Sequence, residues 1–269
     1  MTRPSFAEYG TYDESAHPNL WDGVVGYWAP CLGPSGTRLH DVSRFNNWGT
    51  LTNMDAATDW VIDGGQYGLD FDGSNDYVNA NNRMVDQTMP RMTCSCWMLI
   101  RSSYGIAMNC NWINGFVWYV IPGSSVQTLF IGSGASVNAT IPSTFNVWRH
   151  YWFSFDNGTT RAGYDGIQNR NLTFGSTPNF VTSWGAAPRN NLQMNIGGYG
   201  TSETVNGLMD DVIWWNRALT QDEIRRLYQL GRGGMLERRR RRRVYSVQAD
   251  VVKSYLFVNR GQVIGGGTL

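Results

Sequence analysis

Alternating apolar and polar side chains dominate the chain and predict β-strands along most of its length. In residues 66–80, Leu69 and Phe71 face one side, the aspartates beside them face the other, and a DGSND sequence supplies the turn. Residues 147–167 predict a hairpin of two aromatic-rich strands that turns at Asn157-Gly158. Further strands are expected within residues 23–30, 92–102, 115–121, 127–133, 192–199 and 207–219.

One segment, residues 220–231, has a helical pattern instead. Thr220 and Glu223 form a capping box, and Gly231 ends the helix. The apolar face consists of Ile224, Leu227 and Tyr228. Strand patterns resume after this helix, and we expect the strands of residues 232–269, including a β-hairpin, to lie outside the main fold.

Composition agrees with an all-β protein that has a sizeable core. The 269 residues are 42% hydrophobic and only 16% charged, and they include 12 Trp and 13 Tyr, which favour strands. No run of eighteen apolar residues predicts a membrane span. The first 20 residues lack the apolar segment of a signal peptide, and the four cysteines show no bridging or metal-binding pattern. We therefore expect reduced thiols and synthesis in the cytoplasm.

The charge is divided between an acidic body and a basic tail. Residues 1–231 hold 13 basic and 19 acidic side chains, whereas residues 232–269 hold 9 basic and 2 acidic ones. The tail contains six consecutive arginines: Arg238, Arg239, Arg240, Arg241, Arg242 and Arg243. Three interpretations are open: a solvated linker, a nucleic-acid-binding arm, and an interface with an acidic protein surface. We favour the interface, since no base-stacking motif accompanies the run.

Five segments together resemble the concanavalin A-like, LamG-type jelly-roll family. They are Gly26-Tyr27-Trp28, Asp41-Val42-Ser43 with residues 46–53, Phe71 to Val78, Trp148-Arg149-His150, and residues 206–228. The resemblance covers roughly residues 20–230. It implies a sandwich of two antiparallel sheets with a concave face, a scaffold that serves glycan binding, adhesion and assembly.

The resemblance divides the chain into an N-terminal arm (1–20), a jelly-roll domain (21–231) and a basic tail (232–269). This arrangement looks like that of LamG-type proteins in tailed-phage virions. It implies a capsid decoration protein at the virion surface, anchored through its ends to capsid subunits or to copies of itself, as a homo-oligomer such as a trimer. The alternative is a carbohydrate-binding adhesin module of a fibre or an extracellular protein. No membrane or nucleic-acid partner is expected.

The sequence argues against an enzyme. A retaining glycosidase needs two carboxyl groups about 5 Å apart, and no two of the five glutamates share a strand face. Asp210 and Asp211 are neighbours, so a regular strand would point them to opposite faces. No nucleophile, phosphate-binding or zinc motif is present. We expect neither catalytic residues nor a cofactor.

Calcium is the one metal that the sequence suggests. Asp72, Asn75 and Asp76 lie in one tight loop and carry the oxygen ligands that Ca²⁺ prefers, with Asp210 or Asp211 as a further ligand. In the alternative interpretation, which we favour, these side chains only hold the turn.

The aromatic residues divide into two sets. Trp112, Trp118, Tyr119 and Trp184 are candidates for a sugar-stacking platform, although packing in the core remains open for them. The tryptophans of the predicted strands are expected in the core: Trp28, Trp97, Trp148, Trp152, Trp214 and Trp215. The three histidines share no metal-binding spacing.

Overall fold

The computed structural model describes residues 14–80, 91–102, 105–110, 116–131, 135–173, 194–198 and 203–236. Most of the predicted N-terminal arm lies outside these ranges. The chain divides into two compact units, residues 1–237 and 238–269. The second unit, which contains the arginine run, also lies outside the described residues, so only the first is considered below.

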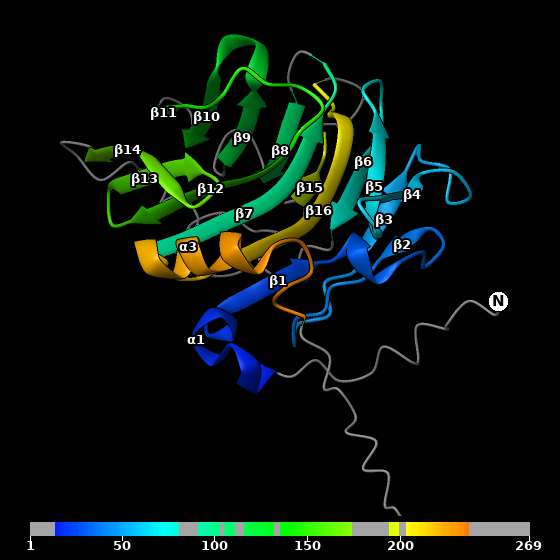
Figure 1. Ribbon diagram of the computed structural model, residues 1–269, viewed down its shortest axis with the longest axis horizontal. Helices are drawn as coiled ribbons and strands as arrows, with labels where there is room; N and C mark the ends of the chain where they lie inside the picture. The colour runs from blue at the N-terminus through cyan, green and yellow to red at the C-terminus, as the bar shows by residue number, and fades with distance from the viewer. Residues whose placement is uncertain are drawn as a thin grey trace, which may run out of the picture. The chain divides into compact units, whose positions relative to one another are not determined.

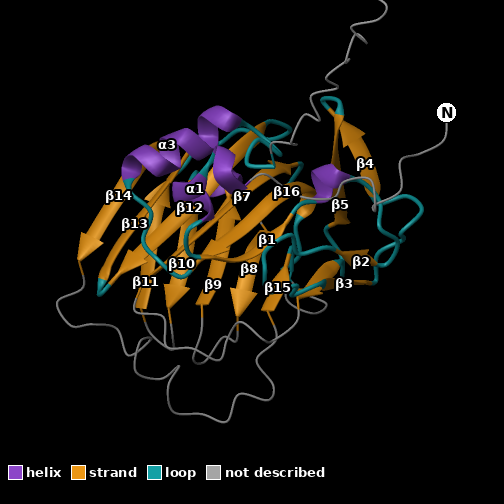
Figure 2. Cartoon of the chain, turned by 90° about the horizontal axis from the view of Figure 1, so that it is seen from below, coloured by secondary structure: helices purple, strands orange, loops and turns teal. Residues whose placement is uncertain are grey.

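Two eight-stranded antiparallel sheets form the fold, as the sequence predicts (Figures 1 and 2). The first sheet runs in the order β14 (Ile167–Thr173), β13 (Thr159–Tyr164), β12 (Trp148–Asp156), β7 (Arg91–Ile100), β16 (Asn206–Trp215), β5 (Gln66–Asp72) and β4 (Trp60–Asp63), with β1 (Val24–Trp28) paired to β16. The second runs β11 (Ala135–Thr140), β10 (Val126–Ile131), β9 (Phe116–Ile121), β8 (Gly105–Cys110), β15 (Met194–Ile196), β6 (Tyr77–Ala80), β3 (Gly49–Thr52) and β2 (Arg38–Leu39).

Local turn chemistry accounts for the predicted hairpin. β12 and β13 pair directly, and Asn157 and Gly158 both have positive φ, as a two-residue turn between antiparallel strands requires. The turn at residues 73–76 behaves differently from the sequence prediction. It connects β5 of the first sheet to β6 of the second, so these two strands do not pair. The local sequence specifies the turn, but the partners of each strand decide which sheet it joins.

The main core lies between the sheets, and β7 shows how the alternation produces it. Cys94, Cys96 and Met98 face the other sheet, while Trp97 between them faces outward, beneath helix α3 (Gln221–Leu230). All four cysteines are free thiols. Five of the six strand tryptophans are buried as predicted. Trp148 is the exception: it is half-buried, and the Arg232 guanidinium lies 3.9 Å from its ring centre.

A second apolar cluster covers the outer face of the first sheet. Helix α3 lies across this face (Figure 1) with α1 (Pro18–Trp21) and the 3-10 turns η2 (Glu14–Ala16) and η3 (Pro30–Leu32) nearby; η5 (Pro122–Ser124) is a third such turn. The predicted capping box is present at Thr220 and Glu223. Met235 and Leu236 are buried in this cluster, so the packed domain continues to residue 236. Among the described residues, no helix is long and apolar enough to cross a membrane.

Candidate ligand-binding site

Trp118 and Tyr119, both predicted candidates for sugar stacking, are buried in β9. Trp118 is fully buried between the sheets, where its Nε1 donates to Gln127 Oε1 at 3.1 Å. Tyr119 faces the other way, and its hydroxyl donates to Glu203 Oε2 at 2.7 Å. Neither ring is available as an exposed platform, because adjacent strand positions here are both covered. Trp112 and Trp184 lie outside the described residues.

The side chains proposed for calcium hold the turn at residues 73–76. Asp72 Oδ1 accepts from Ser74 N at 2.7 Å, and Asp76 Oδ2 accepts from Asp72 N at 2.9 Å. Asn75 uses its backbone carbonyl, which accepts from Asn53 Nδ2 at 2.9 Å. Burial raises the pKa of Asp76 to about 6. These contacts are those of the turn-holding interpretation, and calcium binding stays a prediction.

Arg238 to Arg243 lie outside the described residues. The docking role predicted for them therefore also stays a prediction.

The prediction that Asp210 and Asp211 point to opposite faces is wrong. The register between β16 and β7 shifts between Asp210 and Ile213, and Asp211 has a φ of 45°. This β-bulge inserts an extra residue and re-aims the side chains. One oxygen of each carboxylate and the Sγ of Cys31 consequently lie within 4.8 Å of one another. Simple alternation gave no signal of the bulge.

Hydrogen-bond donors occupy three of the four oxygens in this acid pair. Asp210 Oδ1 accepts from the backbone N–H groups of Cys31 at 3.0 Å and of Asp211 at 2.9 Å. Asp211 Oδ1 accepts from the Tyr27 hydroxyl at 2.8 Å, and its Oδ2 accepts from Gly233 N. Asp210 Oδ2 has no hydrogen-bond partner within the described part of the chain. The acid pair therefore fastens η3 and the turn after α3 to β16.

Electrostatics makes this cluster a poor reaction centre. Burial raises the pKa of both carboxyl groups, that of Asp211 to about 6. The charge of Asp211 also raises the pKa of Asp210, and burial together with both carboxylates raises the pKa of the Cys31 thiol. Cys31 therefore remains a protonated thiol, which is a weak nucleophile. One free carboxylate oxygen also falls far short of the six to eight oxygens that Ca²⁺ takes. We assign the cluster a structural role.

A different buried carboxylate, Asp41, organises the loop of residues 40–48 that joins β2 to β3. Its Oδ1 accepts from the N–H groups of Tyr27 and Ser43, both at 2.8 Å. Its Oδ2 accepts from the Ser43 hydroxyl and from Asn47 N, both at 2.7 Å. The Asn47 carbonyl in turn accepts from Trp28 Nε1 at 2.8 Å. The backbone of the 40–48 loop is therefore held in place from beneath.

This loop presents aromatic rings beside cationic groups. Trp48 is 37% exposed, its ring centre lies 4.2 Å from that of His40, and the Arg38 guanidinium lies 5.6 Å away. We call Arg38, His40 and Trp48 the Trp48 surface. Partial burial, and the charge of Arg38, lower the pKa of His40, which keeps its ring neutral at pH 7. Phe45 is 39% exposed, with the Arg44 guanidinium 5.0 Å from its ring centre.

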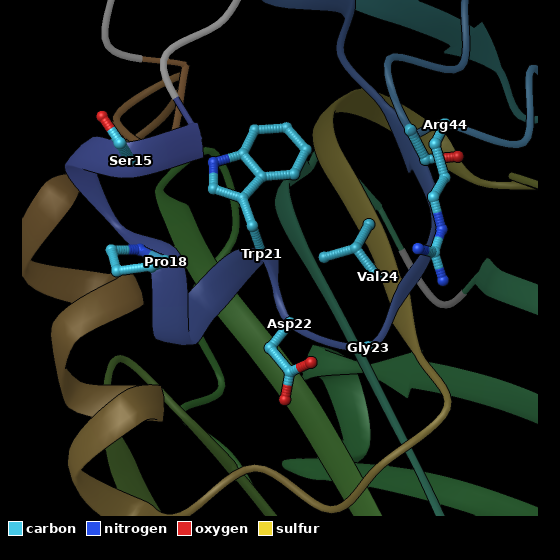
Figure 3. Close-up of a pocket in the computed structure, with 8 residues that line it drawn as sticks. Ser15, Pro18, Trp21, Asp22, Gly23, Val24 and Arg44 are labelled. Atoms are coloured by element: carbon cyan, nitrogen blue, oxygen red, sulfur yellow. The ribbon is translucent and has the colours of Figure 1, made fainter.

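Arg44 also lines a cavity of about 390 Å³ beside α1, which we call the α1 cavity. Its walls are formed by Ser15, Pro18, Trp21, Asp22, Gly23, Val24, Ser43 and Arg44. Trp21 and Arg44 lie on opposite sides of Val24 (Figure 3). The volume is within the range of small-molecule sites. Trp48 lies within residues 46–53, which carry the family resemblance, but no sequence pattern marked its ring as exposed or indicated this cavity.

The family model of the concanavalin A-like lectin/glucanase superfamily, Laminin_G_3, matches residues 72–225, more than half of the chain. The chain belongs to this superfamily. The match includes the acid-pair strand β16 and the first half of α3, whereas the 40–48 loop and the α1 cavity lie before it. No curated protein matches this concanavalin A-like chain in sequence.

Solved structures with the same fold are distant in sequence. Domain 4 of an extracellular arabinanase from Geobacillus stearothermophilus, in complex with arabinotriose, is 15% identical with a TM-score of 0.58, over 77% of this chain and 98% of that one. The botulinum neurotoxin serotype D binding domain is 13% identical with a TM-score of 0.56, over 78% and 52%. Trypanosoma rangeli sialidase in complex with 2,3-difluorosialic acid is 17% identical with a TM-score of 0.54, over 77% of this chain but only 33% of the sialidase. At these identities the likeness shows the fold alone.

Proposed function

We propose that this concanavalin A-like domain is a non-catalytic carbohydrate-binding module whose ligand rests on the Trp48 surface and reaches toward Arg44. The observation that carries the proposal is a half-exposed indole ring on a loop whose backbone is fixed by Asp41. A sugar ring has an apolar face that packs on an aromatic side chain, and a rigid support limits the entropy lost on binding.

The family and its structural relatives support this proposal. The superfamily takes its description from lectins and glucanases, and the arabinanase domain was solved with an oligosaccharide. Both are fold-level analogies, which raise the expectation of glycan binding without assigning a site. The Trp48 surface supplies the site.

The arrangement of the described acids supports a binding module rather than an enzyme. A retaining glycosidase needs two carboxyl groups that flank a bound sugar. The acid pair Asp210 and Asp211 is buried and bonded to η3 and Gly233, so a sugar has no access to it. Glu203 is bonded to Tyr119, and Glu223 caps α3 and pairs with Arg217.

Replacing Trp48 by Ala is expected to weaken glycan binding about tenfold or more, since loss of about 1.4 kcal/mol corresponds to that factor. A glycan array run with the full-length protein identifies a ligand, and calorimetry gives its Kd for each variant. Trp48→Phe should retain most of the affinity because a ring remains. Ile62→Ala, which removes an exposed apolar side chain from β4, is the control and should bind as wild type. Equal Kd values for wild type and Trp48→Ala would refute the assigned site.

The division of charge supports a second candidate, a capsid decoration protein at the virion surface. The body of residues 1–231 carries six more acidic than basic groups, and the tail of residues 232–269 carries seven more basic than acidic ones. A basic tail that orders on an acidic capsid subunit would anchor the jelly roll as an outward head. An extracellular adhesin remains the alternative, with the same head and a different anchor.

Cosedimentation with phage capsids that lack decoration tests this second candidate. Full-length protein should pellet with the capsids, and replacement of Arg238 to Arg243 by glutamine should abolish pelleting at low salt. Native mass measurement of the free and bound protein gives the oligomeric state. Retained pelleting by the glutamine variant would exclude the arginine run as the anchor.

A further inference from the structure

Two arginines beside the exposed rings lack the carboxylate partner that five other arginines of the domain have. The guanidinium groups of Arg91, Arg101, Arg149, Arg217 and Arg225 each lie within 4.0 Å of a carboxylate. In the described part of the chain, no carboxylate lies within that distance of Arg38 or Arg44. Their neighbours are instead the rings of Trp48 and Phe45. Among the described residues, the charge of both arginines is therefore uncompensated, although the body of the chain is acidic.

An uncompensated guanidinium beside an aromatic face fits a particular kind of ligand. The five N–H donors of arginine match the paired oxygens of a carboxylate or sulfate group, and such charge-assisted bonds are about twice as strong as neutral ones. The Trp48 ring offers a place for the body of the ligand at the same time. A neutral sugar would use the ring but would leave the Arg38 charge without a partner.

We propose that the Trp48 surface selects an acidic saccharide, whose carboxylate or sulfate group binds Arg38 while its sugar ring lies against Trp48. This inference rests on the carbohydrate-binding function proposed above and adds the chemical class of the ligand. Arg44, on the same loop and at the α1 cavity, supplies a second positive charge that attracts an anionic chain toward the loop.

Calorimetry with paired probes tests the inference on the full-length chain. Oligogalacturonate is compared with its methyl ester, and dextran sulfate with dextran, so that the members of each pair share one sugar backbone and differ in its anionic groups. The six tail arginines, Arg238 to Arg243, are replaced by glutamine in every variant, because they would bind polyanions by themselves. We expect at least a tenfold preference for the charged member of one pair, and the pair that shows it tells carboxylate from sulfate.

Arg38→Gln should remove this preference by weakening binding of the charged member, whereas Trp48→Ala should weaken binding of both members. Arg225→Gln, which removes an exposed charge from α3, is the charge-matched control and should retain the preference. A preference that survives Arg38→Gln, or equal binding of charged and neutral probes by the parent protein, would overturn the inference alone. Absence of binding to any saccharide would overturn the proposed function as well.

A single-stranded oligonucleotide serves as a further probe. Its phosphate groups can bind Arg38 and its bases can stack on Trp48, in the same way as the anionic group and the ring of an acidic saccharide. If it binds more tightly than any saccharide and Arg38→Gln weakens it, the ligand class assigned here is wrong.

Discussion

Replacing Asp41 by Ala should lower the free energy of unfolding by about 3–6 kcal/mol and abolish glycan binding together with it. The carboxylate is buried and accepts four hydrogen bonds, from the N–H groups of Tyr27, Ser43 and Asn47 and from the Ser43 hydroxyl. Each buried donor left without a partner costs about 1–3 kcal/mol. Urea unfolding followed by circular dichroism measures the loss.

Asp41→Asn and Trp48→Ala separate stability from binding. The amide of Asp41→Asn retains one acceptor oxygen but turns an N–H₂ group toward the donors of Ser43 and Asn47, so we expect a smaller loss of about 1–3 kcal/mol. Trp48→Ala removes a half-exposed ring, and surface changes of this kind shift stability by about 0.5 kcal/mol. Binding should therefore weaken about tenfold or more in Trp48→Ala while the fold persists. If Asp41→Ala were as stable as wild type, the 40–48 loop would be held by other contacts than those described.

His150 should make the domain less stable in acid. The side chain is buried in β12 against the ring of Trp97, with 5.4 Å between ring centres, and burial lowers its pKa from 6.5 to about 3. The unfolded chain takes up a proton below pH 6.5, whereas the folded chain stays neutral until about pH 3. The contribution of neutral His150 to the free energy of unfolding is therefore fully present above pH 6.5 and is lost as the pH falls. The loss amounts to about 3 kcal/mol at pH 4, since each pKa unit corresponds to 1.36 kcal/mol.

The buried acids act in the opposite direction, so the effect of His150 is isolated by difference. The folded-state pKa values of Asp76 and Asp211 are both about 6, above the unfolded value of 3.8, and the folded chain binds their protons more readily as the pH falls through 6. The free energy of unfolding of wild type minus that of His150→Gln should therefore decrease by about 3 kcal/mol between pH 7 and pH 4. The free energy of unfolding of wild type minus that of Asp76→Asn should increase over the same range. Two parallel stability curves for wild type and His150→Gln would show that His150 is solvated in the folded state.

Sequence alone was sufficient where the physical cause is local. The Asn157-Gly158 turn and the α3 capping box depend on a few adjacent residues, whose backbone angles and side-chain oxygens specify the structure directly. Strand alternation likewise predicted the all-β class and the burial of most strand tryptophans, because the period of two places every second side chain in a core.

The functional surfaces were decided by the tertiary structure. The sequence made Trp118 a candidate for a sugar platform and gave no such signal for Trp48, yet Trp118 is fully buried between two sheets and Trp48 is exposed on a loop that Asp41 holds. The bulge in β16 depends on its pairing with β7, and it brought together two carboxylates that alternation separates. Exposure and the convergence of distant side chains depend on which strands pair and what covers each face, and a linear pattern carries no information about either.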